Sequence, residues 1–308
     1  MKKIFALAAI LAFGSAQAEE LKFGDLNYFL KQGQINAGLD WVVHNETARS
    51  GKTDDNEVDA YFYNAHLGYA LTNDLNLTLG LTYVFDGQTE ENGGGSADDS
   101  GLQNPELGAN YRLMKQAEAG FNLDLGAVAT INLADREVSS STKDGNNFNP
   151  MLSNYADPRS SLELNARLGK KWNEANEFYF LGGFIYNLDG DYKQLGDDKV
   201  DMDSSMDFKL GAFYQYRPVN EFMMTLSLTG TRYGEIDGKD GSDSFTMTDH
   251  IDYKFGFDAK YLINESLIAK FSFTKDKRND YDVETDLGDL ELDRRNALQY
   301  GLGIDYLF

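Results

Sequence analysis

The chain has 308 residues, a formal net charge of -22 and no cysteine. The lack of cysteine excludes a disulfide framework, a cysteine-based zinc site and a lipid-anchored lipoprotein, and the acidity argues against a nucleic-acid partner. The mean hydropathy of -0.48 does not exclude a membrane protein, because a strand that turns only every second residue to lipid stays polar on average.

The first eighteen residues have the pattern of a secretory signal peptide. Lys2 and Lys3 are followed by an apolar stretch, 4–13, and by Ala16-Gln17-Ala18, whose small residues suit signal peptidase. The apolar stretch is too short to cross a bilayer as a helix. We therefore predict cleavage after residue 18 and export; the alternative is an N-terminal membrane anchor.

Residues 19–33 precede the repeating pattern. Asp25 suits a helix N-cap, Leu26, Phe29 and Leu30 suit one or two helical turns, and Gly33 suits a helix end. Two interpretations stay open for this segment. It is either a small periplasmic cap or plug, or an extended lead-in or mobile tail.

From residue 34 to residue 308, apolar and polar residues alternate in segments long enough to cross a bilayer as tilted strands. Soluble sandwiches also alternate, but their strands are shorter on average. We predict an all-β, up-and-down transmembrane barrel of about twelve antiparallel strands, at 34–45, 57–71, 75–85, 104–114, 119–133, 161–172, 177–188, 206–217, 222–234, 249–262, 267–275 and 295–308.

The connections between these segments alternate between short and long, as periplasmic turns and extracellular loops do in outer-membrane barrels. The predicted turns are 72–74, 115–118, 173–176, 218–221 and 263–266. The predicted loops are 46–56, 86–103, 134–160, 189–205, 235–248 and 276–294, and together they carry a net charge of -19. We expect these loops to be solvated, with diffuse binding of divalent cations as an alternative.

The last strand resembles the C-terminal signature of bacterial outer-membrane barrels. One of its faces ends in the terminal Phe308, and that face carries Leu298, Tyr300, Leu302, Ile304, Tyr306 and Phe308. The resemblance implies a location in the outer membrane of a Gram-negative bacterium, contact with lipid and lipopolysaccharide, and recognition of Phe308 by the barrel assembly machinery.

A local resemblance covers residues 102–133, LQNPELGANYRLMKQAEAGFNLDLGAVATINL. This segment is similar to the transporter-like barrels linked to the meta-pathway of phenol degradation. It has Asn104-Pro105 where that family tends to have Gly-Asp, and 132–134 is Asn-Leu-Ala rather than Pro-Thr-Gly. We infer no substrate from this resemblance.

No catalytic, cofactor-binding or metal-binding motif emerges. The three histidines, His44, His66 and His250, fall on polar strand faces, and none has a serine two residues later as in barrel phospholipases. The acidic loops do not match a twelve-residue calcium loop. We therefore expect a protein that is not an enzyme and has no cofactor.

Alternation places charged residues of both signs on the inward face, where they become candidates for lining a pore: Asp40, Asp59, Glu106, Arg112, Asp124, Glu163, Arg167, Asp207, Lys209, Arg217, Asp252, Lys254, Asp258, Lys260, Lys270 and Asp305. Such side chains either line a water-filled channel or pair across a narrow barrel and close it. Eight glycines on the same face favour an open interior: Gly80, Gly108, Gly120, Gly126, Gly211, Gly256, Gly301 and Gly303.

The sequence therefore predicts a porin-like channel for passive diffusion of small hydrophilic solutes, with a weak preference for cations. The alternative is a barrel that does not conduct and whose acidic loops serve adhesion or surface interaction.

Overall fold

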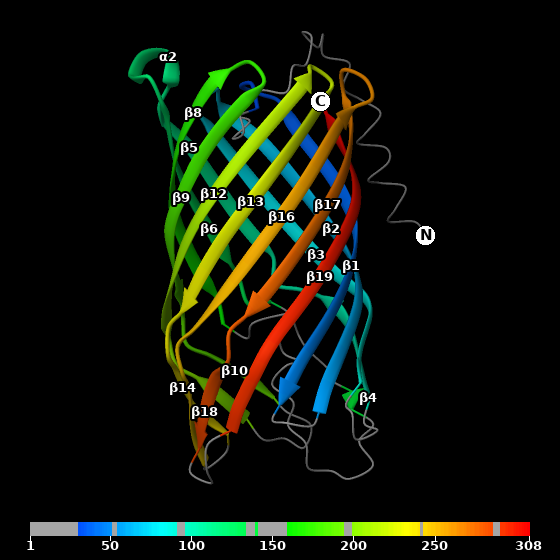
Figure 1. Cartoon of the computed structure of the whole chain (residues 1–308), viewed down its shortest axis with the longest axis vertical. Coiled ribbons are helices and arrows are strands. Elements are labelled where there is room, and N and C mark those ends of the chain that lie inside the picture. The colour runs from blue at the N-terminus through cyan, green and yellow to red at the C-terminus, as the bar shows by residue number, and fades with distance from the viewer. Residues whose placement is uncertain are drawn as a thin grey trace.

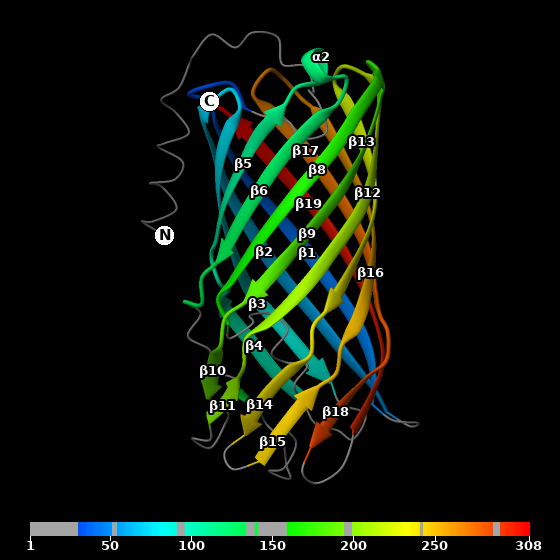
Figure 2. The ribbon, with the colours of Figure 1, turned by 90° about the vertical axis from the view of Figure 1, so that its left-hand side faces the viewer.

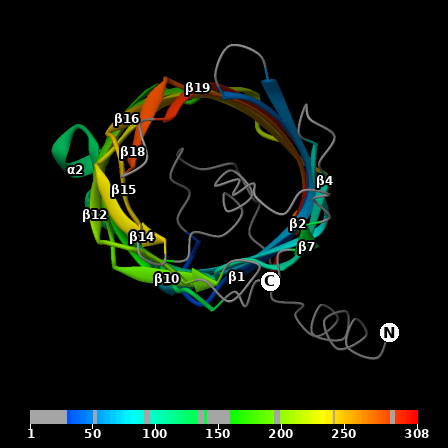
Figure 3. The same cartoon turned by 90° about the horizontal axis from the view of Figure 1, so that it is seen from below.

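The computed structural model describes residues 30–50, 54–90, 96–133, 139–140, 159–193, 199–240, 243–285 and 290–308. Twelve long antiparallel strands form a closed barrel, as predicted (Figure 1, Figure 3). They are β1 (Ile35–Ser50), β2 (Asp54–Thr72), β3 (Leu75–Glu90), β5 (Glu106–Met114), β6 (Asn122–Thr130), β8 (Ser161–Asn173), β9 (Asn176–Asn187), β12 (Ser205–Val219), β13 (Phe222–Tyr233), β16 (His250–Leu262), β17 (Leu267–Arg278) and β19 (Leu290–Leu307).

Each wall strand pairs with its neighbours in chain order, and the first and last strands close the ring. Asp40 of β1 lies opposite Asn64 of β2 on one side and Gly303 of β19 on the other. The closure leaves no free edge along the wall, so that the backbone groups of every wall strand find partners within lipid.

The two ends of the barrel differ, as Figure 2 shows. Short turns lie at the upper end in Figure 1, together with the C-terminus and the small helix α2 (Gln116–Ala119). Long connections lie at the opposite end. By the usual arrangement of outer-membrane barrels, the end with the turns is periplasmic and the other is extracellular.

Asparagine side chains shape two of the periplasmic turns. Asn173 Oδ1 accepts a bond from the amide of Ala175 at 2.9 Å, and Asn264 Oδ1 accepts one from Leu267 at 2.9 Å. These local bonds replace backbone pairing where the chain reverses. Outside the membrane, Lys115 Nζ lies 2.8 Å from Asp74 Oδ2, and hydrogen bonding to Asp74 raises the pKa of Lys115.

The extracellular connections contain strands that the sequence did not predict: β4 (Ser96–Leu102), β7 (Ser139–Ser140), β10 (Gly190–Lys193), β11 (Lys199–Met202), β14 (Ile236–Asp240), β15 (Asp243–Met247) and β18 (Tyr281–Thr285). Five of them and β19 form the continuous order β10, β11, β14, β15, β18, β19 beyond the wall. These strands are short, so no run of alternating apolar residues is long enough to mark them in the sequence.

The outer surface of the wall is apolar. Apolar residues that alternate with the inward ones face lipid; for example, Phe180 is 56% exposed and Leu226 is 43% exposed. The same face carries Leu79, Leu125, Phe255 and Phe271. Exposed aromatic side chains lie near both ends of the band, with Tyr69 and Trp172 on the periplasmic side. This pattern is that of a lipid-facing barrel with aromatic girdles.

No described helix is long and apolar enough to cross a membrane. Buried apolar side chains do not form one central core. Their main cluster lies at the periplasmic end and contains Leu30, which precedes the first strand. Residues 1–29, including the predicted signal peptide and most of the segment 19–33, lie outside the described residues.

Candidate functional site

The strand register places fourteen of the sixteen pore-lining candidates on the inner face. For example, Asp40 and Lys270 both lie opposite Gly303 of β19, and Asp124 lies opposite Arg112 and Arg167. The fourteen are Asp40, Glu106, Arg112, Asp124, Glu163, Arg167, Asp207, Lys209, Asp252, Lys254, Asp258, Lys260, Lys270 and Asp305.

Two candidates lie elsewhere. Asp59 lies opposite Asn45 and bonds to its amide group on the outer face, because residues 58 and 60, rather than 59, share the face of Asp40. Arg217 lies at the periplasmic rim beyond a register shift, where its Nη2 donates to the carbonyl of Glu174 at 2.6 Å. Neither residue lines the middle of the interior.

Among the described residues, the inner face also carries charged side chains that were not predicted to line the pore: Glu46, Lys171, Glu177, Asp276 and Arg278. Glu46, Asp276 and Arg278 fell in predicted loops, because the strands continue further towards the extracellular side than their apolar pattern does. With these additions, acidic residues exceed basic residues on the inner face.

One cluster of charges joins four strands near the periplasmic third of the barrel. Lys270 Nζ lies 2.6 Å from Asp305 Oδ1 and 2.8 Å from Asp40 Oδ1. His66 Nε2 lies 3.0 Å from the same Asp305 oxygen. These side chains retain partial exposure, 31% for His66 and 25% for Asp40, so that solvent reaches the cluster from the interior.

A second cluster lies on β5, β6 and β8. Arg112 binds Asp124 with two bonds, Nε to Oδ1 at 2.8 Å and Nη2 to Oδ2 at 3.1 Å, and Asp124 is 1% exposed. Arg167 lies opposite Asp124 on the other side. A bidentate pair of this kind holds the guanidinium in one orientation.

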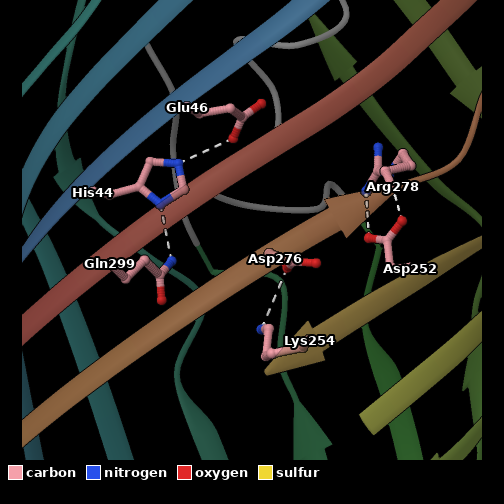
Figure 4. Close-up of polar contacts among 7 residues, drawn as sticks. All are labelled: His44, Glu46, Asp252, Lys254, Asp276, Arg278 and Gln299. Carbon is pink, nitrogen blue, oxygen red and sulfur yellow. Dashed lines mark hydrogen bonds and ion pairs between the residues drawn. The ribbon is translucent and has the colours of Figure 1, made fainter. Parts of the chain in front are cut away.

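Towards the extracellular half, further ion pairs follow the wall (Figure 4). Arg278 donates to both oxygens of Asp252, at 2.9 Å and 3.2 Å. Lys254 Nζ lies 3.6 Å from Asp276 Oδ2, and the Lys254 side chain is 50% exposed although it faces inward. A lysine so exposed on the inner face indicates a wet interior rather than a packed one.

His44 and His250 form hydrogen bonds with neighbouring residues of the barrel, as histidines with a structural role do. His44 Nε2 lies 3.0 Å from Glu46 Oε2, and its Nδ1 lies 2.9 Å from the amide nitrogen of Gln299 (Figure 4). His250 Nδ1 lies 3.3 Å from the carbonyl of Thr248. No group of three or more potential metal ligands occurs among the described residues. The absence of enzymatic activity stays a prediction.

Small residues line much of the remaining inner wall. A side chain at Gly256 would collide with Ser227 Oγ, and one at Gly301 would collide with Ser272 Oγ, so these glycines and serines share the inner face. Gly120 does not: it ends α2 in a periplasmic turn with a φ of 81°. Its positive φ, not space in the interior, explains this glycine.

Comparison with known proteins shows the fold. No family model and no curated protein matches the sequence. The structure resembles the COG4313 outer membrane channel from Pseudomonas putida F1, with a TM-score of 0.58 and 17% identity over 93% of this chain and 100% of that one. It also resembles the translocator domain of the autotransporter NalP from Neisseria meningitidis, with a TM-score of 0.51 and 11% identity over 99% and 93%.

The chain has the fold of both, and the first is named as an outer membrane channel. A closed barrel with an apolar outer band and a polar inner wall meets the requirements for crossing a bilayer with strands. The protein is therefore an outer-membrane β-barrel of the Gram-negative type.

Proposed function

We propose that this protein is an outer-membrane channel for the passive diffusion of small hydrophilic solutes, with a preference for cations. The observation that most supports this proposal is that the interior ion pairs run along the wall and not across the interior. Arg278–Asp252 and Lys254–Asp276 join adjacent strands, while Lys209–Glu163 and Lys270–Asp40 each span one intervening strand. These pairs brace the wall without bridging the barrel.

Exposure of the inner charges supports the same function. Lys254 is half exposed and Lys209 is 30% exposed, values that require water beside them. A polar, hydrated interior is what lets porins pass small solutes. The fold is also that of a solved protein named as an outer membrane channel, which agrees with this proposal.

The charge distribution favours cations. Acidic residues exceed basic ones on the inner face, and exposed acids lie on the extracellular side, among them Asp189, Asp203 and Glu235. A negative mouth concentrates cations within about one Debye length, ~10 Å at 0.1 M salt and ~3 Å at 1 M. The preference for cations should therefore be stronger at low salt.

Planar-bilayer recording tests this proposal. The purified barrel should give conductance steps, with a cation preference at 0.1 M KCl that falls near 1 M. Changing Asp189, Asp203 and Glu235 together to the corresponding amides should weaken selectivity at low salt and leave conductance at 1 M nearly unchanged. Anion selectivity at low salt would contradict the role of the acids, and a folded barrel without any steps would contradict the channel.

The second candidate is a barrel that serves surface interaction. It is supported by the strands that continue beyond the wall, from β10 to β18, because ordered extracellular hairpins present a defined surface. Absence of conductance together with binding of a surface ligand to these hairpins would favour it.

A further inference from the structure

Leu30 occupies the periplasmic end of the barrel, immediately before the first strand. It is only 6% exposed and belongs to a cluster with Ala70 of β2, Met223 of β13, Ile268 of β17 and Leu307 of β19. Going round the ring from β13 to β2 means passing β16, β17, β19 and β1. The cluster therefore joins Leu30 to inward-facing apolar side chains that come from separate parts of the wall.

The backbone beside Leu30 is fixed to β2. The amide of Gly33 donates to the carbonyl of Ala70 at 2.9 Å, and the amide of Ala70 donates to the carbonyl of Gln34 at 3.0 Å. The amide of Gln32 donates to Asn73 Oδ1 at 2.9 Å. Gly33 has a φ of 83°, which permits the sharp turn that brings Leu30 back over the barrel end.

The wall is shaped to receive this side chain. A Cβ atom at Gly68 would lie 3.4 Å from Leu30 Cδ1, so Leu30 packs directly against the inner face of β2 at a residue without a side chain. Gly68 and Ala70 are successive inward positions of that strand. The packing of Leu30 against β2 explains why positions 68 and 70 are occupied by small residues.

Leu30 also lies on the periplasmic side of the charged cluster formed by His66, Lys270 and Asp305. Ile268 precedes Lys270 by one inward position on β17, and Leu307 follows Asp305 by one inward position on β19. A solute that moves past Lys270 and Asp305 towards the periplasm next meets the apolar layer around Leu30. Apolar constrictions limit passage because they do not replace the hydration shell of ions.

We propose that Leu30, held by residues 31–34, forms the constriction that sets the size limit at the periplasmic exit of the channel. This inference rests on the proposed channel function and names the residue that determines its selectivity for size. The residue acts by occupying the exit, so its volume and polarity should control what passes.

The test compares three variants of the full-length protein in planar bilayers and in swelling assays of proteoliposomes with sugars of increasing size. Leu30→Ser should raise single-channel conductance and admit larger sugars, and Leu30→Trp should lower both. Ala117→Ser is the matched control, because Ala117 is an exposed residue of α2 at the same end of the barrel; it should behave like the unchanged protein. Unchanged conductance and sugar limit in both Leu30 variants would overturn the inference.

A double-cysteine variant tests the placement itself. The chain has no cysteine, so Leu30→Cys combined with Gly68→Cys introduces a single pair of thiols, near each other because a Cβ atom at residue 68 would lie 3.4 Å from Leu30 Cδ1. A short bifunctional thiol reagent should crosslink residues 30 and 68, and the crosslinked exit should conduct less than the same variant without crosslinking. A folded double variant that does not crosslink would refute the placement.

The experiments distinguish a failure of the Leu30 inference from a failure of the channel proposal. Conductance steps that are identical in all variants leave the channel standing and remove Leu30 as its constriction. No steps from any folded variant, including the unchanged protein, overturn the channel and the constriction together, while a crosslink between residues 30 and 68 would still confirm where Leu30 lies.

Discussion

An arginine placed on the lipid face should destabilise the barrel, whereas the same residue one position away should not. Leu226 lies on the outer face of β13 between Tyr214 and Phe257 and is 43% exposed. An arginine near the middle of the bilayer costs ~2–4 kcal/mol in barrels of this kind. Taking ~2.8 kcal/mol, Leu226→Arg should lower the equilibrium constant for folding about 100-fold.

The matched control is Thr225→Arg, on the inner face of the same strand. Thr225 lies opposite Asp258, so the new guanidinium enters a polar interior beside a carboxylate, and we expect a loss below ~1 kcal/mol. Urea titration of folding into lipid vesicles measures both free energies, and heat-dependent mobility in SDS gels checks that each variant folds. Equal losses, or a larger loss for Thr225→Arg, would refute the assignment of the two faces.

Two further predictions follow from the inner wall and from the orientation of the barrel. Asp124→Ala removes a buried carboxylate and should leave Arg112, which is 11% exposed, beside Arg167. The loss of unfolding free energy should be ~3 kcal/mol, measured by the same urea titration; a loss below ~1 kcal/mol would mean that the pair contributes little to stability. An epitope tag between β14 and β15 should bind antibody on intact cells, whereas a tag at Glu174 should do so only after the outer membrane is permeabilised, and the reverse pattern would invert the topology.

Alternation was sufficient to predict the wall because lipid and lumen impose opposite requirements on successive residues. Leu226 and Thr225 illustrate this: their facing follows from a period of two, and it holds across the whole strand once one residue is placed. The turns were predictable for a similar reason, since Asn173 and Asn264 bond to their own backbone and mark where a strand must stop.

The extracellular ends were not predictable in the same way. Glu46 and Arg278 lie on strands, yet no lipid-facing leucine or phenylalanine accompanies them, because the wall there extends beyond the apolar band. Asp59 was assigned to the wrong face because its charge was followed there instead of the period: unbroken alternation from Tyr63 along β2 places it on the outer face, where it pairs with Asn45.

The position of Leu30 could not be predicted from the sequence. Its apolar neighbours suggested helical turns, and two interpretations, a plug and a lead-in, fitted equally well. The structure places Leu30 against Gly68 and near Ile268, residues that are 38 and 238 positions away in the chain. A contact of that kind depends on closure of the whole ring, which no local pattern encodes.

The inner wall combines two kinds of contact with different consequences for a channel. Ion pairs such as Arg278–Asp252 lie along the wall between neighbouring strands, so they hold the barrel's shape and leave its centre free. The apolar cluster that contains Leu30 instead lies on the inner face at the periplasmic end. If the protein conducts, substitutions in the ion pairs should therefore alter selectivity for charge, whereas substitutions at Leu30 should alter selectivity for size. Because the two sets of residues do not overlap, the two properties should change independently.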